Sequence, residues 1–540
     1  MEKRLILGTT AMIHETRRRY RNLRWTIFAS SLIGADAWWR RIGIAVPVMS
    51  VVPWVLIVGC SLNRVGREEV SAAIERHLKD RSATAERYAR TPAVTETPAV
   101  GENPAVEESS DSDRTSETSP QSMQAPATLR EFIVRALEVN PEIQAAQEVA
   151  RARAERIPQV TALPDPILRT KTLPEPVRTA EGDNFFVLGV SQKLPAPEKL
   201  DRRGRIALEE TRMALERLRQ TRIRVIADVK RAYFQLYILG KSIEITEANQ
   251  NLMHGLIDVA RAQVTAGRRR QDDVLRAQTE LSNLEAERIA LRQRRVTVVA
   301  KLNELLSRPS TMSIDTPEDF EVRQVDLTVE ALFSKAIKAN PELKSLERRM
   351  ERDRRAIELA KLAHWPDFTI GFEWMPMDPR GAFKAPINPA TGRRPVTPQL
   401  SEDGSDNWAI TFGFNLPIWF DKIKAGEEES RRNLSASKLQ FAAARNRVRF
   451  QIEDALERVR SQQQLADLFQ NTIIPQAEQT YYVSQASYTA GASDFLYVMD
   501  NWRKWLVFTI QYYRSLGELE RSVADLEQAL GVSLSEMGAP

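Results

Sequence analysis

The residues that most often carry chemistry are few and scattered in this 540-residue sequence. The four histidines are far apart: His14, His77, His254 and His364. A metal site or a catalytic dyad needs such side chains at short spacings, and the sequence contains neither a nucleophile elbow nor a phosphate-binding loop. His254 lies on an apolar helical stretch, where a packed imidazole is commoner than a ligand. We therefore expect no catalytic activity, no cofactor and no bound metal.

The single cysteine, Cys60, occupies a position that predicts a covalent modification. It closes an apolar run, residues 42–59, that follows Arg40 and Arg41 and ends in Val-Gly. A basic flank, an apolar core and a small residue at the end are typical of a secretory signal. This ending resembles the lipobox at which bacterial lipoproteins are cleaved and acylated. We expect Cys60 to become the lipidated first residue of the mature protein.

Two other interpretations of this segment stay open. The apolar run is nearly long enough for a membrane-spanning helix, although Pro47 and Pro53 weaken that assignment. A lone cysteine among apolar residues can also simply be packed. Ser61, directly behind the cysteine, favours sorting to the outer membrane. The stretch before the signal is long and basic, which suggests a start codon further downstream.

Composition favours long helices over a stack of compact domains. The chain is 28% charged, with only 22 glycines and 28 prolines, and its net charge is +5. Basic and acidic residues alternate along the helical stretches, so the sequence gives little support to a nucleic-acid partner. Residues 83–127 lose their large apolar side chains and fill with Thr, Ser, Pro, Glu and Ala. We interpret them as a disordered tether between the lipid anchor and the folded body.

The folded body is an internal repeat. Residues 136–143 read Ala-Leu-Glu-Val-Asn-Pro-Glu-Ile, and residues 336–343 read Ala-Ile-Lys-Ala-Asn-Pro-Glu-Leu. We divide the chain at the following boundaries: an extension and signal at 1–59, a lipidated tether at 60–127, a first repeat at 128–309, a linker at 310–327, a second repeat at 328–531 and a tail at 532–540.

Each repeat continues with a pair of predicted strands of about 8 to 10 residues, a length that suits a tilted membrane strand. The second strands run from Asn184 and Asn407 to matching Leu-Pro pairs. Apolar and polar residues alternate along residues 410–415, as in a sheet with one apolar and one wet face. Aromatic residues cluster at the strand ends, which is typical of an interfacial girdle, although each alone is consistent with core packing.

A very long helical stretch follows each strand pair, at about 197–266 and 421–490. At ~1.5 Å per residue, ~70 residues reach ~105 Å, which only a coiled-coil assembly stabilises. Both stretches end in a turn with the sequence Thr-Ala-Gly, made of Thr265, Ala266 and Gly267 in one repeat and Thr489, Ala490 and Gly491 in the other. Gly is the natural residue for reversing a helix, so return helices are expected to run to Pro309 and Gly531.

These features occur in the same order in both repeats. Together they resemble the TolC family of outer-membrane efflux channels. The resemblance covers about residues 128–531. It implies a mainly α fold with a transmembrane β part, in which long antiparallel coiled-coil helices form a periplasmic tunnel. It also implies a homotrimer whose protomers each give four strands to a shared 12-stranded barrel, with a periplasmic adaptor, an inner-membrane pump and outer-membrane lipid as partners. A periplasmic coiled-coil adaptor or a structural lipoprotein without a pore is the alternative, although an adaptor usually has one helical hairpin.

The family closes the periplasmic end of the tunnel with acidic and hydrogen-bonding residues near the two turns. By position, Asp273, Asp500 and Tyr488 are the candidates for this gate, and the two Thr-Ala-Gly turns are the candidates for adaptor contact. Position 497 is Tyr where an acidic residue would strengthen the assignment, and residues 268–270 are three arginines that could pair with Asp273 or a neighbour. Solvated surface charge is an equally good interpretation. Residues 375–406 form a longer loop than residues 174–183. A cover over part of the external mouth and plain surface decoration are equally good interpretations of it.

Overall fold

The computed structural model describes residues 128–179, 181–317, 319–320, 327–378, 389–393 and 404–537. These residues all belong to one compact unit, Val65–Pro540. The predicted signal, Cys60 and the tether lie outside the described residues, as does most of the long loop at 375–406. Among the described helices, none combines the length and apolar character needed to cross a lipid bilayer.

Each repeat opens with short helices joined at an Asn-Pro step. The first repeat has α6 (Leu129–Val139), α7 (Pro141–Ala154) and α8 (Arg156–Thr161), and the second has α11 (Val329–Ala339) and α12 (Pro341–Lys361). Asn140 and Asn340 cap the second helix of each set, because each side-chain oxygen accepts a backbone N–H two residues ahead. Pro at the first helical position loses no hydrogen bond, so the Asn-Pro pair starts both helices well.

The same two asparagines tie the beginning of each repeat to its end. Asn140 Nδ2 donates to the Leu305 carbonyl at 3.1 Å, and Asn340 Nδ2 donates to the Ala529 carbonyl at 2.7 Å. Leu305 and Ala529 lie at the ends of the return helices, whose last carbonyls have no partner within the helix. The two Asn-Pro sequences therefore share their contacts as well as their order in the chain.

The strands form one antiparallel sheet with the order β1-β2-β3-β5. Its members are β1 (Ile167–Thr179), β2 (Gly182–Leu194), β3 (Phe368–Met375) and β5 (Asn407–Phe414), and β4 (Met377–Asp378) pairs with part of β2. The first pair is 13 residues long on each side, so the prediction of 8 to 10 residues was wrong there, and the predicted loop at 174–183 is mostly strand. A register shift between Thr172 and Val177 lets β1 pass its two prolines, which cannot donate to a ladder.

Cross-strand partners show that the sheet has one mostly apolar and one mostly polar face. Directly opposed residues share a face, and the register joins Leu168 to Val190, Val190 to Phe372 and Phe372 to Ile410. The apolar face presents Leu168, Phe186, Leu188, Val190, Leu194, Phe368, Ile370, Phe372, Trp374, Trp408, Ile410, Phe412 and Phe414, interrupted by Thr170, Thr172 and Gln192. The other face includes Arg169, Lys171, Ser191, Lys193, Thr369, Glu373, Asn407 and Thr411, interrupted by Ile167, Val187, Ala409 and Met375.

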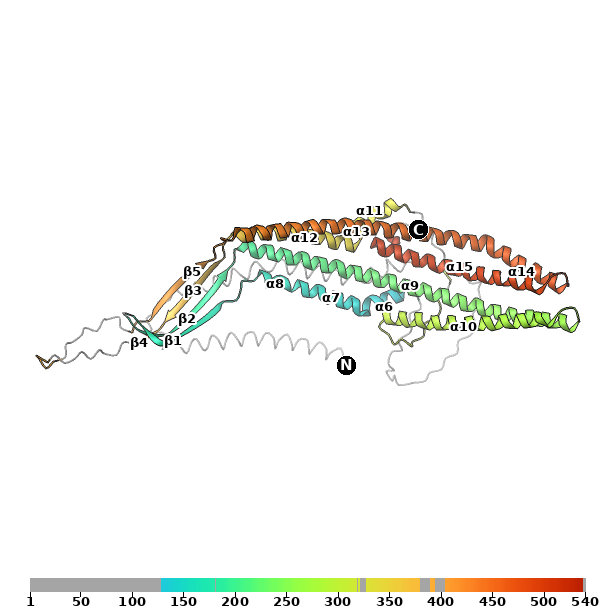
Figure 1. Cartoon of the computed structure of the whole chain (residues 1–540), viewed down its shortest axis with the longest axis horizontal. Helices are drawn as coiled ribbons and strands as arrows, with labels where there is room; N and C mark the ends of the chain where they lie inside the picture. Colours follow the sequence, from blue (N-terminus) through green and yellow to red (C-terminus); the bar gives the residue numbers. More distant parts are fainter. Residues whose placement is uncertain are drawn as a thin grey trace, which may run out of the picture. The chain divides into compact units, whose positions relative to one another are not determined.

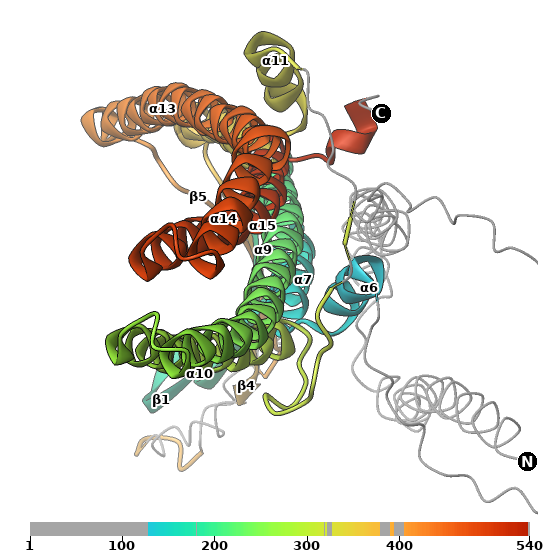
Figure 2. The ribbon, with the colours of Figure 1, turned by 90° about the vertical axis from the view of Figure 1, so that its right-hand side faces the viewer.

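Long helices follow each strand pair, as predicted. The first repeat has α9 (Pro197–Thr265) and α10 (Gln271–Leu305). The second has α13 (Phe420–Leu468), α14 (Ile474–Thr489) and α15 (Phe495–Leu530). In Figure 1 the strands lie at one end of these helices and the hairpin turns at the other. Figure 2 shows the helices as a curved layer, with α6 and α11 on its convex side.

The predicted continuous helix at 421–490 is interrupted by a π-helical segment, Phe469–Ile473, which ends two residues before Pro475. The second repeat has one residue more between Arg447 and Gly491 than the first has between Arg224 and Gly267. A π turn holds one extra residue while the helix continues, so the segment keeps the buried faces on both sides of it aligned. Val448 and Ile452 before the segment are buried like Val225 and Val229, and Ser484 after it is buried like Ala260.

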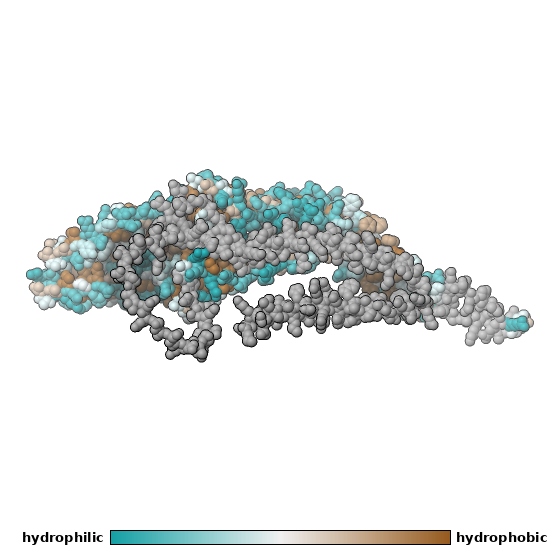
Figure 3. Space-filling model, turned by 180° about the vertical axis from the view of Figure 1, so that it is seen from behind, coloured by the Kyte–Doolittle hydropathy of each residue, from teal (hydrophilic) through white to brown (hydrophobic). Residues whose placement is uncertain are grey.

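Buried apolar residues of the helices form several separate cores. One core joins α6 to α9 and the end of α10, and its counterpart joins α11 to α13 and the end of α15. A third core lies near the hairpin turns, where α9, α10, α14 and α15 meet around Trp502 and Tyr481. On the face shown in Figure 3 the helical body is largely hydrophilic, with hydrophobic patches toward the turns.

Candidate functional site at the hairpin turns

The two Thr-Ala-Gly turns have the same backbone geometry. Gly267 has φ +70° and Gly491 has φ +84°, in the left-handed region that glycine adopts without strain. The N–H of Gly267 donates to the Val264 carbonyl at 2.9 Å, and the N–H of the next residue donates to Gln263. Gly491 repeats both bonds, which together satisfy the last carbonyls of α9 and α14. The sequence prediction of two glycine-terminated turns is confirmed.

Two of the three predicted gate residues meet across the hairpins. The hydroxyl of Tyr488, on α14, donates to Asp273 Oδ2, on α10, at 3.1 Å. Asp273 is only 8% exposed and the Tyr488 side chain is fully buried. Because the two residues come from different repeats, this bond joins one helical hairpin to the other at the turns.

Burial controls the protonation of this pair. Desolvation raises the pKa of the Asp273 carboxyl above its usual value, and the Tyr488 hydrogen bond only partly opposes it. Burial and the neighbouring Asp273 charge also raise the pKa of Tyr488, so its hydroxyl stays protonated and available as a donor. The hydroxyl therefore stays available to donate, while the carboxylate is held where its charged form is costly.

An arginine from the first turn covers the pair. The Arg269 guanidinium lies 5.0 Å from the centre of the Tyr488 ring, and its Nη2 donates to the Ser493 carbonyl at 2.5 Å. Among its neighbours, Arg270 lies 3.5 Å from Asp272. Residues 268–270 thus contact the second turn through the Tyr488 ring and the Ser493 carbonyl. The carboxylate that pairs with one of these arginines is Asp272.

The structure does not bring the third candidate, Asp500, to this pair. Asp500 lies on the exposed side of α15, where Lys504 Nζ approaches its carboxylate at 2.7 Å within one helix turn. Tyr497, at the position where an acidic residue was sought, is also exposed. Asp500 is thus a surface charge near the turns in the single protomer.

Three further contacts between the hairpins are not predictable from either repeat alone. Arg503 forms a two-pronged ion pair with Glu280, with nitrogen to oxygen distances of 3.0 and 3.3 Å. Trp502 Nε1 donates to Asn249 Oδ1 at 2.9 Å, and Gln263 Nε2 donates to the Thr489 carbonyl at 3.1 Å. Each joins residues more than 200 positions apart, so only the packing of the two hairpins reveals them.

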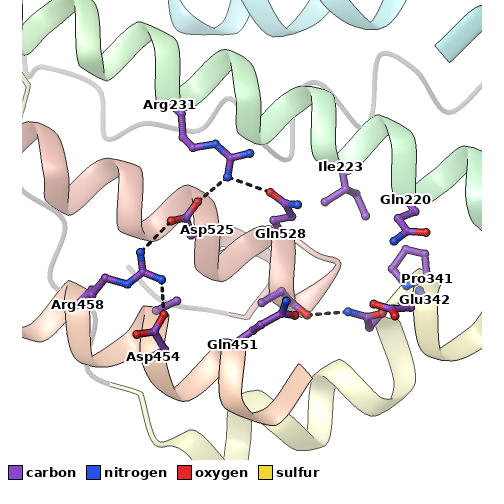
Figure 4. A pocket seen from close by; sticks show the side chains of 13 residues that line it. Gln220, Ile223, Arg231, Pro341, Glu342, Gln451, Asp454, Arg458, Asp525 and Gln528 are labelled. Atoms are coloured by element: carbon purple, nitrogen blue, oxygen red, sulfur yellow. Dashed lines mark hydrogen bonds and ion pairs between the residues drawn. The ribbon is translucent and has the colours of Figure 1, made fainter. Parts of the chain in front are cut away.

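The described surface includes an open groove and a cavity. An open groove of about 590 Å³ follows α14 and includes Thr489 and Ala490 of the second turn together with Tyr482. A second cavity, of about 340 Å³, lies where the end of α15 meets the beginning of α12 (Figure 4). Four charged residues of its lining, Arg231, Asp525, Arg458 and Asp454, form a chain of ion pairs. Within the described residues, no group of three or more His, Cys, Asp or Glu side chains could hold a metal ion.

The sequence and the fold were compared with known proteins. A family model described as outer membrane efflux protein matches residues 132–308 and 332–532, one match for each repeat. A search of curated proteins finds no match.

Solved structures with the same fold are outer-membrane channels at low sequence identity. The VceC outer membrane protein of Vibrio cholerae is 16% identical, with a TM-score of 0.60, and the match covers 75% of this chain and 96% of that one. The CmeC outer membrane channel of Campylobacter jejuni is 14% identical, with a TM-score of 0.60 and coverage of 80% and 94%. CusC is 14% identical, with a TM-score of 0.63 and coverage of 78% and 99%.

Proposed function

The chain belongs to the outer membrane efflux protein family, and from this premise we propose that three copies form the outer-membrane channel of a tripartite efflux system. The channel is a passive conduit for small solutes such as drugs or metal ions. A periplasmic adaptor and an inner-membrane pump are its partners, and lipidation at Cys60 anchors it. A lone adaptor is disfavoured, because this chain has two hairpins, each preceded by a strand pair.

The two-faced sheet is the observation that carries this proposal. One face is nearly continuous in apolar and aromatic residues, and Phe412 on it is 77% exposed in the single protomer. Large exposed apolar surfaces of this kind fit lipid, while the opposite face with Arg169, Lys171 and Thr411 fits water. In the described sheet β1 and β5 are edges, and open edges cannot face hydrocarbon. Three protomers supply twelve strands, which can close.

The contact at the hairpin turns supports a gate. Tyr488 and Asp273 hold the two hairpins of one protomer together, with Arg269 over the tyrosine ring. Separation of the hairpins requires this bond to break, so the bond favours the closed state. In a trimer Asp500 is repeated around the axis as a ring of like charge, which favours cations. The groove along α14 at Thr489 and Ala490, with the first turn at Thr265, Ala266 and Gly267, is the surface for the adaptor.

Single-channel conductance in planar bilayers tests the channel and the gate together. Tyr488→Phe removes the hydroxyl, keeps the ring and leaves the Asp273 carboxylate buried without its donor. Loss of a buried hydrogen bond to a charged group costs about 1–3 kcal/mol, so we expect the ratio of open to closed channels to rise roughly 5- to 150-fold. Tyr482→Phe is the matched control, because Tyr482 is exposed on the same helix.

The outcomes separate the parts of the proposal. No discrete conductance from a folded trimer contradicts the channel itself. Conductance with identical open fractions for Tyr488→Phe and Tyr482→Phe leaves the channel in place and removes the Asp273 to Tyr488 bond from the gate. Asp500→Ala is expected to weaken cation selectivity with little change in the open fraction, and unchanged selectivity contradicts the charged ring.

A further inference from the structure

The polar face of the sheet can be followed in rows, because directly opposed residues share a face. Two neighbouring rows begin on β1, one at Arg169 and the next at Lys171. The other strands add Gly189, Glu373 and Ala409 to the first row, and Val187, Met375 and Asn407 to the second. These two rows therefore hold two cations and one carboxylate, an excess of one positive charge in each protomer.

Both cationic side chains extend from the sheet without a partner. Arg169 and Lys171 are exposed, and within the described residues neither forms an ion pair or a side-chain hydrogen bond. Gly189, opposite Arg169, has no side chain to cover it. Glu373 lies over this glycine, since a Cβ at Gly189 would be 3.1 Å from Glu373 Cγ. The one carboxylate thus lies beside the Arg169 row without pairing, and Lys171 has none in its own row.

Other carboxylates on these strands lie too far away to cancel the excess. Along β1 the next ones are Asp165, four residues before Arg169, and Glu175, four residues after Lys171. On β2, Asp183 is equally far from the residue opposite Lys171. At ~3.3 Å per residue, four residues span ~13 Å, which exceeds the ~8 Å over which physiological salt screens a charge. The two rows therefore keep a positive potential of their own.

The architecture of the strand pair does not require these cations. Counted from the two Leu-Pro pairs, β1 and β3 align with Arg169 at the position of Gly371 and Lys171 at that of Glu373. The second repeat thus builds the same strand with a glycine and a carboxylate. Packing of the sheet does not account for two adjacent cations on β1.

Closure of the proposed barrel also leaves the cations without a partner. β1 and β5 are the edges of the described sheet, so β1 of one copy lies beside β5 of the next. The residues of β5 on the polar face are uncharged: Asn407, Ala409, Thr411 and Gly413. Whatever the register between copies, this strand brings no carboxylate to Arg169 or Lys171.

We propose that the middle of the barrel is an anion-binding section, in which Arg169 and Lys171 of three copies form a basic band that takes up small carboxylates and phosphates. The proposal rests on the proposed trimeric channel and adds a class of solute to it. Rings of Arg or Lys side chains favour anions in pores, and a guanidinium binds carboxylate or phosphate through two parallel hydrogen bonds. Asp500 lies toward the hairpin turns, at the other end of the long helices (Figure 1), so its ring acts on ions separately.

Ion selectivity in planar bilayers tests the basic band. All channels carry Asp500→Ala, so that the acidic ring does not mask the barrel. Arg169→Gln combined with Lys171→Gln removes both charges and keeps polar side chains on the polar face. In a KCl gradient we expect the ratio of chloride to potassium permeability to fall roughly threefold or more, with a smaller change at about 1 M salt. Lys338→Gln is the matched control, because Lys338 is exposed on α11, on the convex side of the helical layer.

A binding measurement gives a second readout that does not depend on conductance. The probe is pyrene tetrasulfonate, and its fluorescence anisotropy is measured with the detergent-solubilised full-length trimer at low salt. The dissociation constant is expected to rise roughly tenfold in the double variant and to stay unchanged in Lys338→Gln. Citrate and inorganic phosphate are expected to displace the dye, whereas glucose at the same concentration leaves it bound.

Glu373→Gln provides a change of opposite sign. It removes the one carboxylate of the two rows, so chloride permeability should rise and the dye should bind more tightly. An unchanged permeability ratio or an unchanged dye affinity in the double variant overturns the basic band, while discrete conductance steps leave the channel in place. A folded protein without conductance contradicts the proposed channel and the basic band with it.

Discussion

The buried carboxyl of Asp273 is the single group on which the contact between the two hairpins depends most. It accepts from Tyr488 at 3.1 Å, but Asp272 and Asp494 lie near enough to oppose its charge, as burial does. A neutral carboxyl can still bond to the tyrosine hydroxyl and costs less to bury. The protonated form of Asp273 therefore suits the closed hairpins better than the charged form.

This asymmetry predicts a pH dependence of the gate. The pKa of Asp273 is raised in the folded protein, so its contribution to stability is complete below the unfolded pKa and is lost as pH rises through the folded pKa. Acidification through the range between the ordinary carboxyl pKa and the raised pKa of Asp273 is thus expected to lower the open fraction in planar bilayers. Asp273→Asn, which imitates the neutral acid, should remove this part of the pH response; a variant that keeps the parental profile contradicts the assignment.

At the scale of elements, the π-helical segment Phe469–Ile473 shows how a helix absorbs an insertion without losing its packing. A one-residue insertion in a regular helix turns the following residues by about 100°. Here Tyr481, Ser484 and Tyr488 after the segment still face the core. The extra residue therefore stays within the π turn. The turn ends two residues before Pro475, whose missing N–H already prevents a regular helical hydrogen bond.

Single-residue deletions at matched places distinguish the two outgoing helices. Deleting Gln470 removes the extra residue and returns the second repeat to the spacing of the first, so the fold is expected to tolerate it. Deleting Ala248, at the corresponding place in α9, turns Met253, Leu256 and Ile257 out of their core and should cost more than about 3 kcal/mol. Thermal unfolding followed by circular dichroism measures both. Equal losses of stability in the two deletion variants would contradict the interpretation of the π-helical segment as a one-residue insertion.

At the scale of the whole molecule, several surfaces of the described protomer are left uncovered by the chain itself. The sheet has two edges, an exposed apolar face and a polar face, and the curved helical layer ends at α13 and α10. Apolar residues on α13 and on the sheet are exposed in one protomer in a way that a finished assembly would not leave to water. In the proposed channel, assembly with other copies and contact with lipid cover these surfaces.

The two faces of the sheet respond differently to charge. Phe412→Lys places an ammonium group on the proposed lipid face, which costs roughly 2–4 kcal/mol near the middle of a bilayer. Thr411→Lys places the same group on the polar face beside it. The amount of SDS-resistant trimer in the outer membrane is expected to fall strongly for Phe412→Lys and little for Thr411→Lys. A similar loss for both would contradict the assignment of the faces.

The sequence by itself determined the repeat, the strand pairs, the long helices and both glycine turns, because each depends on local rules. Asn-Pro caps, Leu-Pro endings and a glycine at positive φ act over a few residues and appear twice. The lengths of β1 and β2 and the interruption at Phe469–Ile473 were missed, since a register shift and a single inserted residue leave no clear local pattern.

The tertiary structure decided which residues of the two repeats meet. Sequence position proposed Asp273, Tyr488 and Asp500 as equals, and only the packing of the hairpins joined the first two and left Asp500 with Lys504. Arg269 over the Tyr488 ring and Arg503 on Glu280 depend on the same packing. The physical reason is that a contact between distant residues is fixed by how whole helices pack. The local sequence around either side chain does not indicate which residue it will contact.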